Sequence, residues 1–321
     1  MPHVALARNA MATRFEMILH GADESRLRAA GEEALAEIER IEAQLSFYRP
    51  TSEVSRLNAH AADAPVRVDP ELFRLLRHAL QLARETGGAF DLTVAPLMRA
   101  WGFTRSTGQC PDPRTLAEAK ACTGWRNVEL DERESTVRFA RPGVMLDLGA
   151  LGKGHALGRA AEILREDGVT SALIHGGTST ACAIGSTPDG EPWKVAIERP
   201  RPPGTPPPAG PAGLLATVPL RDESLSVSAV WGKSFTVDAR VFGHVIDPRT
   251  GEPAQGALLA AVALPSAAET DAFSTALLTA GPQGHDALAA LRPGMKTLLL
   301  TECRSGGGLA VASKGIETSP G

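Results

Sequence analysis

Asp271 and Thr275 stand four residues apart in a stretch rich in alanine and leucine, ETDAFSTALLTAG. If this stretch is helical, the two side chains lie on one face, one turn apart. A carboxylate and a hydroxyl are hard oxygen ligands, and Mg²⁺ takes few protein ligands and completes its octahedral shell with water and substrate phosphates. The pair therefore suits Mg²⁺ better than Ca²⁺ or zinc. The same spacing also occurs in helices that bind no metal, so the pattern alone leaves a structural role open.

A glycine-rich turn with a lysine lies at residues 145–155, MLDLGALGKGH. The apolar run 144–146 predicts a strand before the turn, and the apolar spacing of 156–166 predicts a helix after it. Glycines permit close backbone approach, a helix N-terminus offers free N–H groups, and Lys153 adds a full positive charge. The turn thus favours a phosphate-containing ligand, although an ordinary strand-to-helix turn has the same composition. Neither a Walker A loop nor a complete G-x-G-x-x-G is present.

His244 and Asp247 fall in the segment GHVIDPRTG, where Pro248 and Gly251 indicate a turn. His244 has the chemistry of a general base or of a hydrogen-bond donor to phosphate, and Asp247 is the second candidate base. Arg249 is suited either to binding phosphate or to capping carbonyl groups. A purely structural turn is the alternative interpretation.

Asp91 follows small residues and one aromatic residue in the loop Gly88-Ala89-Phe90-Asp91. A carboxylate in such a loop suits hydrogen bonding to a planar heterocycle. Taken by itself, it is equally typical of a turn aspartate.

Hydrophobic periodicity predicts the elements that must position these residues. Helices are expected over 23–45, 70–84, 111–121, 156–166 and 270–281. Strands are expected over 13–20, 171–175, 193–198, 214–220, 225–229 and 258–264, with hairpins at 128–130/136–139 and 295–301/309–312.

The composition is that of a globular chain large enough to bury a substantial core. A net charge of −4 gives no general attraction to nucleic acid or anionic membranes, so we expect no nucleic-acid partner. No signal-peptide pattern, membrane anchor or apolar run of about 18 residues is visible, which favours a cytoplasmic location. The four cysteines form no C-x-x-C pair, so neither zinc binding nor a disulfide framework is indicated.

The domain organisation expected is a single domain over 1–312 with a Pro/Gly-rich insertion at 199–213, RPRPPGTPPPAGPAG. The strands 193–198 and 214–220 on either side of the insertion are expected to pair around it. A two-domain arrangement is the alternative. Residues 313–321 are expected to form a disordered tail.

Five blocks in order and spacing together resemble the FAD:protein FMN transferase family, the ApbE-like flavin transferases. They are LSFYRPTSEVSRLN, GGAFDLTVAPLMRAWGF, LDLGALGKG, GHVIDPRTGEP and ETDAFSTALLTAG, within residues 11–281. The resemblance implies an α+β fold with mixed or antiparallel sheets flanked by helices, in an ApbE-like, T-fold-like architecture. It also implies Mg²⁺-dependent transfer of FMN from FAD to a Thr or Ser hydroxyl of an acceptor flavoprotein, with release of AMP. The alternatives are an FAD pyrophosphatase, which forms FMN and AMP, and a non-catalytic flavin-binding protein.

The resemblance also implies a role for each candidate site residue. Mg²⁺ would be held by the Ala150 main-chain carbonyl, Asp271 and Thr275. His244 would lie close to the reacting phosphate. The residues implied to bind FAD are Met11, Tyr48, Ala89, Phe90, Asp91, Asp147, Lys153, His244 and Ile246.

The chain departs from the family pattern at four positions. Many relatives carry an aspartate after the paired glycines, where this chain has Thr178, and a T-S-G-type segment where it has Val227-Ser228-Ala229. Relatives often have Tyr and Asp at the positions of His155 and Gly158. These departures concern substrate positioning more than metal binding, because the implied metal set is intact.

Overall fold

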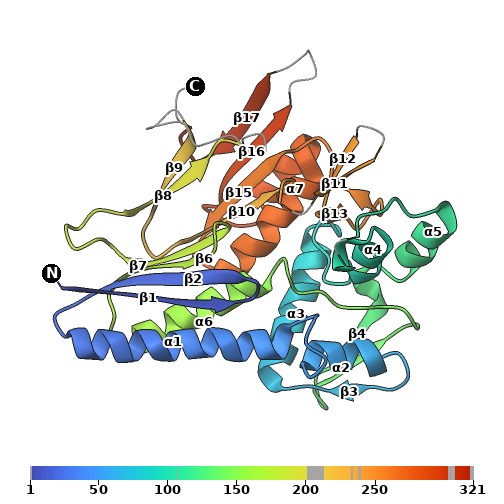
Figure 1. The fold of residues 1–321 in the computed structure, drawn as a ribbon, viewed down its shortest axis with the longest axis horizontal. Helices are drawn as coiled ribbons and strands as arrows, with labels where there is room; N and C mark the ends of the chain where they lie inside the picture. The colour runs from blue at the N-terminus through green and yellow to red at the C-terminus, as the bar shows by residue number, and fades with distance from the viewer. Residues whose placement is uncertain are drawn as a thin grey trace.

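The structure is a computed structural model that describes residues 2–105, 107–200, 213–232, 234–237, 240–302 and 308–318. Its central element is an eight-stranded sheet, in which every neighbouring pair is antiparallel (Figure 1). The strands, in their order across the sheet, are β1 (His3–Ala10), β2 (Thr13–His20), β6 (Ser171–Gly176), β7 (Thr180–Gly185), β10 (Ser224–Ala229), β15 (Leu259–Leu264), β16 (Lys296–Glu302) and β17 (Leu309–Lys314). No strand was expected over β1, where the alternation of apolar and polar residues is short and ends in Asn and Ala.

The helices lie beside this sheet and at one end of it (Figure 1). They are α1 (Glu24–Leu45), α2 (Glu53–His60), α3 (Pro70–Glu85), α4 (Ala95–Ala100), α5 (Pro113–Ala121), α6 (Gly152–Glu166) and α7 (Ala267–Ala289), with short 3₁₀ helices η1 (Phe103–Arg105) and η2 (Trp125–Asn127). Within the described part of the chain, no helix is both long and apolar enough to cross a membrane.

Four small sheets of the described residues complete the architecture. They are β3 (Val66–Arg67) with β5 (Thr136–Phe139) and β4 (Val128–Asp131), β8 (Trp193–Glu198) with β9 (Leu214–Leu220), β11 (Ser234–Val237) with β12 (Arg240–Gly243), and β13 (Ile246–Asp247) with β14 (Glu252–Pro253). The α+β fold with antiparallel sheets is therefore confirmed.

Strand β15, inside the central sheet, is buried on both faces, and its residues alternate between two cores. Ala260, Val262 and Leu264 enter the larger core, which α1, α6 and α7 complete. The alternate residues Leu259, Ala261 and Ala263 enter a second core with residues of β8 and β9. Since successive side chains of a strand point to opposite faces, a strand covered on both sides is apolar at every position.

Side-chain caps explain where the helices α1, α3 and α7 begin. The side chain of Asp23 accepts a hydrogen bond from Arg26 N at 3.0 Å at the start of α1, and Asp69 does the same for Glu71 N at 2.8 Å before Pro70, the first residue of α3. Ser266 caps α7 through Glu269 N. These caps satisfy backbone donors that have no partner within the helix.

The helix expected over 270–281 is the first part of α7. The backbone at Gly281 is non-helical, with φ 61° and ψ −160°, and Pro282 follows within the same continuous element. Glycine adopts this conformation readily, and proline can begin a new helical turn because its missing N–H has no partner there. The expected end of the helix therefore coincides with a kink, after which the chain is helical again.

The strand expected over 144–146 is not formed, which corrects the sequence prediction. The main-chain groups of Leu146 bond instead to the side chain of Asn58, with N–H···Oδ1 at 2.7 Å and Nδ2–H···O at 3.0 Å. Asp147 N donates to Leu92 O at 2.8 Å. An asparagine side chain from α2 thus occupies the hydrogen-bonding groups that a partner strand would need.

The C-terminal prediction is also corrected for residues 313–318. Ser313 and Lys314 belong to β17, the Ile316 side chain is buried, and Thr318 forms a bridge with Ala216 of β9. Burial of one apolar side chain and pairing with the sheet order this segment. Residues 319–321 lie outside the described residues.

The Pro/Gly-rich insertion at 199–213 lies for the most part outside the described residues, which omit 201–212. The strands that flank it pair as expected. β8 and β9 are antiparallel, with Trp193 opposite Leu220.

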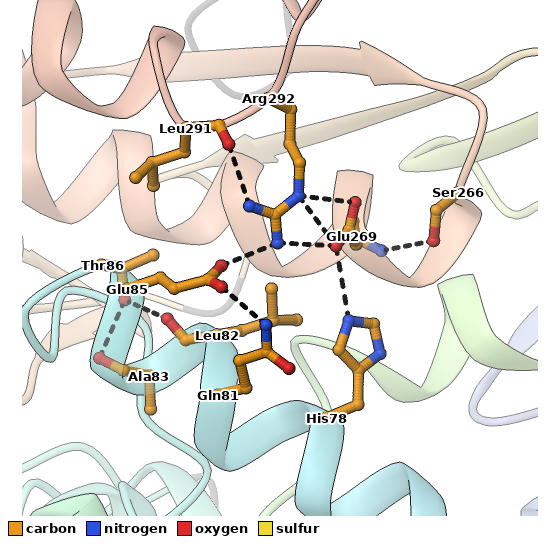
Figure 2. A network of polar contacts seen from close by, with 10 residues as sticks. All are labelled: His78, Gln81, Leu82, Ala83, Glu85, Thr86, Ser266, Glu269, Leu291 and Arg292. Atoms are coloured by element: carbon orange, nitrogen blue, oxygen red, sulfur yellow. Dashed lines mark hydrogen bonds and ion pairs between the residues drawn. The ribbon is translucent and has the colours of Figure 1, made fainter.

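A polar network joins α3 to α7 near the start of the latter (Figure 2). The Arg292 guanidinium donates to Glu269 from Nη2 at 2.8 Å and to Glu85 at 2.7 Å, and it lies 5.0 Å from the centre of the Phe273 ring. His78 Nε2 is 3.4 Å from the Glu269 carboxylate. Hydrogen bonding by His78, and then by Arg292, lowers the pKa of Glu269 from 4.5 to about 2.

This network predicts acid-sensitive stability. The folded protein holds the pKa of Glu269 below its ordinary value, so the carboxylate stabilises the fold above pH 4.5 and that contribution is lost as the pH falls toward about 2. We expect the free energy of unfolding, measured by urea titration, to fall more steeply over this range in the wild type than in Glu269→Gln. The exposed Glu24→Gln variant serves as the control, and equal slopes in wild type and Glu269→Gln would contradict the prediction.

Candidate active site

A cavity of about 1160 Å³ gathers most of the residues singled out in the sequence. Segments far apart in the chain form its wall: the turn before α6, the buried side of α7, strands β8 and β10, and the turn after β12. The candidate residues that line it are Asp91, Asp147, Ala150, Lys153, His244, Ile246, Asp271 and Thr275. Met11, Tyr48, Ala89, Phe90 and Asp247 are not part of this wall.

The contact between α6 and α7 brings the glycine-rich turn to the carboxylate of α7. Gly154 N donates to Asp271 Oδ2 at 3.0 Å, and Lys153 Nζ lies 3.8 Å from Asp271 Oδ1. Lys153 Nζ also donates to Gly149 O at 3.3 Å. Asp271 is buried, and a buried charge is costly unless it is compensated. Here a backbone N–H donor and a nearby ammonium group compensate it.

Gly154 has a packing role that differs from the phosphate-loop role suggested by its sequence. A Cβ at this position would lie 2.1 Å from Ala267 O on α7. Only a residue without a side chain allows the first turn of α6 to approach α7 this closely. The close approach is what places Asp271 beside Lys153.

We predict opposite effects on stability for two glycines of α6. Gly154→Ala forces a backbone clash and should lower the free energy of unfolding by about 1–3 kcal/mol. Gly158→Ala meets nothing within 4 Å and should raise it by about 0.5–1 kcal/mol, because alanine favours a helix. Thermal unfolding of both variants is the measurement. A Gly154→Ala protein as stable as Gly158→Ala would show that α7 moves away without cost.

Hydroxyl groups connect α7 to the neighbouring strand β10. Thr275 Oγ1 lies 3.1 Å from Ser228 Oγ, which is also 2.9 Å from Ser274 Oγ. One strand pleat earlier, Ser226 Oγ is 3.0 Å from Thr270 Oγ1. Ser228 was not among the candidate site residues, although the alternation of serines in an otherwise apolar strand was a signal for a polar row on one face.

The oxygen donors on the cavity wall fit a hard divalent cation. Asp271 contributes a carboxylate, Thr275 a hydroxyl and Ala150 a main-chain carbonyl, all lining one space. Among the described residues, no group of three or more His, Cys, Asp or Glu side chains is placed to hold a metal. A sparse, all-oxygen set of this kind suits Mg²⁺ completed by phosphate oxygens, and it does not suit zinc.

The segment after β12 places His244 and Ile246 on the cavity wall, whereas Asp247 binds Arg249. Both Asp247 oxygens accept hydrogen bonds from Arg249, with Nε–Oδ1 at 2.9 Å and Nη2–Oδ2 at 2.7 Å. Asp247 is buried, and this bond raises the pKa of Arg249. Of these two residues, only His244 lines the cavity, whereas Asp247 is engaged by Arg249 and lies outside the cavity wall.

The loop at 89–91 reaches the cavity only through Asp91. Its carboxylate accepts hydrogen bonds from Thr93 N at 2.8 Å, Thr93 Oγ1 at 2.6 Å and Trp125 N at 2.7 Å. Burial raises the pKa of Asp91 despite these bonds. The side chains of Ala89 and Phe90 are buried in the main core and do not line the cavity.

Met11 and Tyr48 lie outside the cavity wall. Met11 and Ala12 form the turn between β1 and β2 with φ values of 51° and 57°, the left-handed pair that a type I′ hairpin turn requires. Tyr48 is 63% exposed. Partial burial of its phenol and then the charge of Asp147 raise the pKa of Tyr48, which places the ring within electrostatic reach of a cavity residue.

The departures from the family pattern divide between two places. Thr178 and Ala229 line the cavity, where they affect whatever binds there. His155 and Gly158 line a separate hollow of about 560 Å³ between α3 and α6. Burial lowers the pKa of His155.

The cavity wall also contains residues from several elements that the sequence did not single out. They are Lys194 of β8 and Arg199 just after it, His175 of β6, Trp231 just after β10, and Val94 and Met98 at α4. Burial lowers the pKa of His175, so the imidazole is favoured in its neutral form. No local pattern identifies these residues, because their elements meet at the cavity only through tertiary packing.

Comparison with known proteins agrees with this architecture. Residues 11–299 match the model of the ApbE family. The FAD:protein FMN transferase of Haemophilus influenzae is 30% identical over 269 residues, covering 81% of this chain and 76% of the relative. That of Treponema pallidum is 31% identical over 287 residues, covering 85% and 77%.

Two solved structures share the fold over nearly their whole length. The ApbE protein of Thermotoga maritima superposes with a TM-score of 0.85 at 28% identity, covering 96% of each chain. The apo form of the flavinyl transferase ApbE of Pseudomonas stutzeri gives 0.84 at 28% identity, covering 98% of this chain and 95% of the other. With its sequence and its fold in agreement, the chain belongs to the ApbE family.

Proposed function

We propose that the protein transfers FMN from FAD to a Thr or Ser hydroxyl of an acceptor flavoprotein and releases AMP, with Mg²⁺ as the metal. The observation that carries the proposal is the α6–α7 contact, which places Lys153 and Asp271 together in a cavity that His244 also lines. The relatives named above are FAD:protein FMN transferases, and the chain covers most of their length.

In this proposal different residues of the cavity bind different parts of FAD. Lys153 and Asp147 bind the dinucleotide near the turn before α6, and Asp91 and Ile246 contact its ring systems from the opposite segments. Met11 and Tyr48 contribute from the rim, and the main chain of Ala89 and Phe90 supports Asp91. Mg²⁺ would be held by the Ala150 main-chain carbonyl, the Asp271 carboxylate and the Thr275 hydroxyl, and it would neutralise the charge of the pyrophosphate.

The covalent step then requires a base near the acceptor hydroxyl. His244 takes the hydroxyl proton as the acceptor oxygen forms a bond to the FMN phosphorus. The bond between that phosphorus and the bridging oxygen breaks, and AMP leaves with the bridging oxygen. Lys153 stabilises the negative charge that develops on the phosphates.

One incubation tests the proposal against its alternatives. The protein is mixed with FAD, Mg²⁺ and a candidate acceptor domain, and the products are separated by mass spectrometry and chromatography. A covalent FMN adduct with AMP supports transfer, and EDTA should abolish it. Free FMN with AMP would replace transfer by FAD pyrophosphatase activity, and intact bound FAD would indicate a non-catalytic flavin-binding protein.

A further inference from the structure

Arg249 contacts three segments that contribute residues to the cavity wall: its own turn, α7 and the loop at 88–91. Besides its two bonds to Asp247, its Nη2 donates to Thr279 O on α7 at 3.1 Å. Its Cγ lies 3.7 Å from the position that a Cβ on Gly88 would occupy. Thr279 in turn donates from Oγ1 to Ala89 O at 2.6 Å. The Arg249 guanidinium therefore links the turn that carries His244 to α7, and the aliphatic part of the same side chain lies near the loop that carries Asp91.

The position of this link on α7 matters for the site. Thr279 follows Thr275 by four residues, so both lie on the same face of α7, one turn apart. At the other end of the link, Asp247 follows His244 by three residues within one short turn. The bond from Arg249 to Thr279 thus connects the turn that carries the proposed base to the helix that carries two of the proposed metal ligands.

Other contacts also hold the turn in place and do not depend on Arg249. Trp101 Nε1 donates to Gly251 O at 2.8 Å, and Ile246 pairs with Pro253 in the β13–β14 ribbon. Loss of Arg249 should therefore leave the turn folded. What it removes is a planar, bidentate connection that lysine cannot reproduce, because an ammonium group lacks the fixed fork of donors.

We infer that Arg249 is a positioning residue that fixes the His244 turn to α7, with Asp247 serving to orient the guanidinium. The catalytic consequence rests on the proposed function, since it concerns the alignment of His244 with a substrate held by α7. Arg249 does not line the cavity, so it acts through His244. Misplacement of a reacting group by about 1 Å can lower a rate about 100-fold.

The test compares Arg249→Gln and Arg249→Lys with Lys296→Gln. The control breaks the Lys296–Glu223 ion pair, which is 2.6 Å long, is partly buried and lies outside the cavity wall. For Arg249→Gln we expect kcat of FMN transfer to fall by about 10- to 100-fold, with KM for FAD changed less than about twofold. Arg249→Lys should recover only part of this loss, and Lys296→Gln should retain wild-type kcat.

Amide hydrogen exchange provides a second readout that does not depend on activity. Amides of residues 244–251 should exchange at least about tenfold faster in Arg249→Gln than in the wild type or in Lys296→Gln, because local opening becomes easier. Unchanged kcat, a rise in KM alone, or an equal loss in Lys296→Gln would overturn the inference. If the wild type forms neither adduct nor AMP, the proposed function fails. In that case amide hydrogen exchange alone tests whether Arg249 fixes the turn to α7, and an unchanged exchange rate in Arg249→Gln would overturn that inference.

Discussion

Replacement of Asp271 by asparagine is expected to lower kcat/KM for FMN transfer by about 1000-fold, equivalent to about 4 kcal/mol of transition-state stabilisation. Asparagine has the shape of aspartate and keeps an oxygen to accept the hydrogen bond from Gly154 N, which is 3.0 Å long in the wild type. It lacks the negative charge that attracts a divalent cation. The fold should therefore persist while metal binding is lost.

The measurement is the rate of adduct formation at increasing Mg²⁺ concentration, with thermal unfolding as a check on the fold. Asp23→Asn is a matched control, because Asp23 makes a similar hydrogen bond to a helix N-terminus, at the start of α1 and away from the cavity. Transfer by Asp271→Asn at the wild-type rate in low Mg²⁺ would remove Asp271 from the proposed metal site.

Replacement of His244 by glutamine is expected to lower kcat by about 100- to 10,000-fold while leaving FAD affinity close to that of the wild type. Glutamine retains hydrogen-bonding capacity and similar volume, but it cannot accept a proton at neutral pH. Removal of a base affects the proton transfer in the transition state. It does not remove the Lys153 and Asp147 groups proposed to bind the dinucleotide.

Quenching of flavin fluorescence measures FAD affinity, and single-turnover formation of the adduct measures the chemical step. His60→Gln is the control, because His60 is an exposed residue of α2 that does not line the cavity. An unimpaired His244→Gln protein would exclude His244 as the base. Loss of FAD affinity with an unchanged kcat would assign it to ligand binding instead.

Local physics made several features of the site predictable. The spacing of Asp271 and Thr275 predicted one helical face, and both residues lie on α7 and line the same cavity. Capping residues and hydrophobic periodicity likewise predicted the helices near 23–45 and 70–84 to within a few residues. These patterns are readable because they depend on neighbours within one or two turns of the same element.

Other features depended on partners far away in the sequence. Val144-Met145-Leu146 has the composition of a strand, yet Asn58 on α2 satisfies the main chain of Leu146 and no ladder forms. The segment after Ser313 has a polar composition, yet Ile316 is buried and Thr318 bridges to β9. Neither outcome has a local signal, because the deciding group lies on another element.

The sequence by itself determined the chemical groups of the candidate site and the elements that carry them. Tertiary structure alone decided that Gly154 is required by the closeness of α7, that Ser228 bonds to Thr275, and that Asp247 is held by Arg249. The physical reason is that hydrogen bonds and steric contacts between elements depend on how the helices pack on the sheet. No spacing along the chain encodes that packing directly.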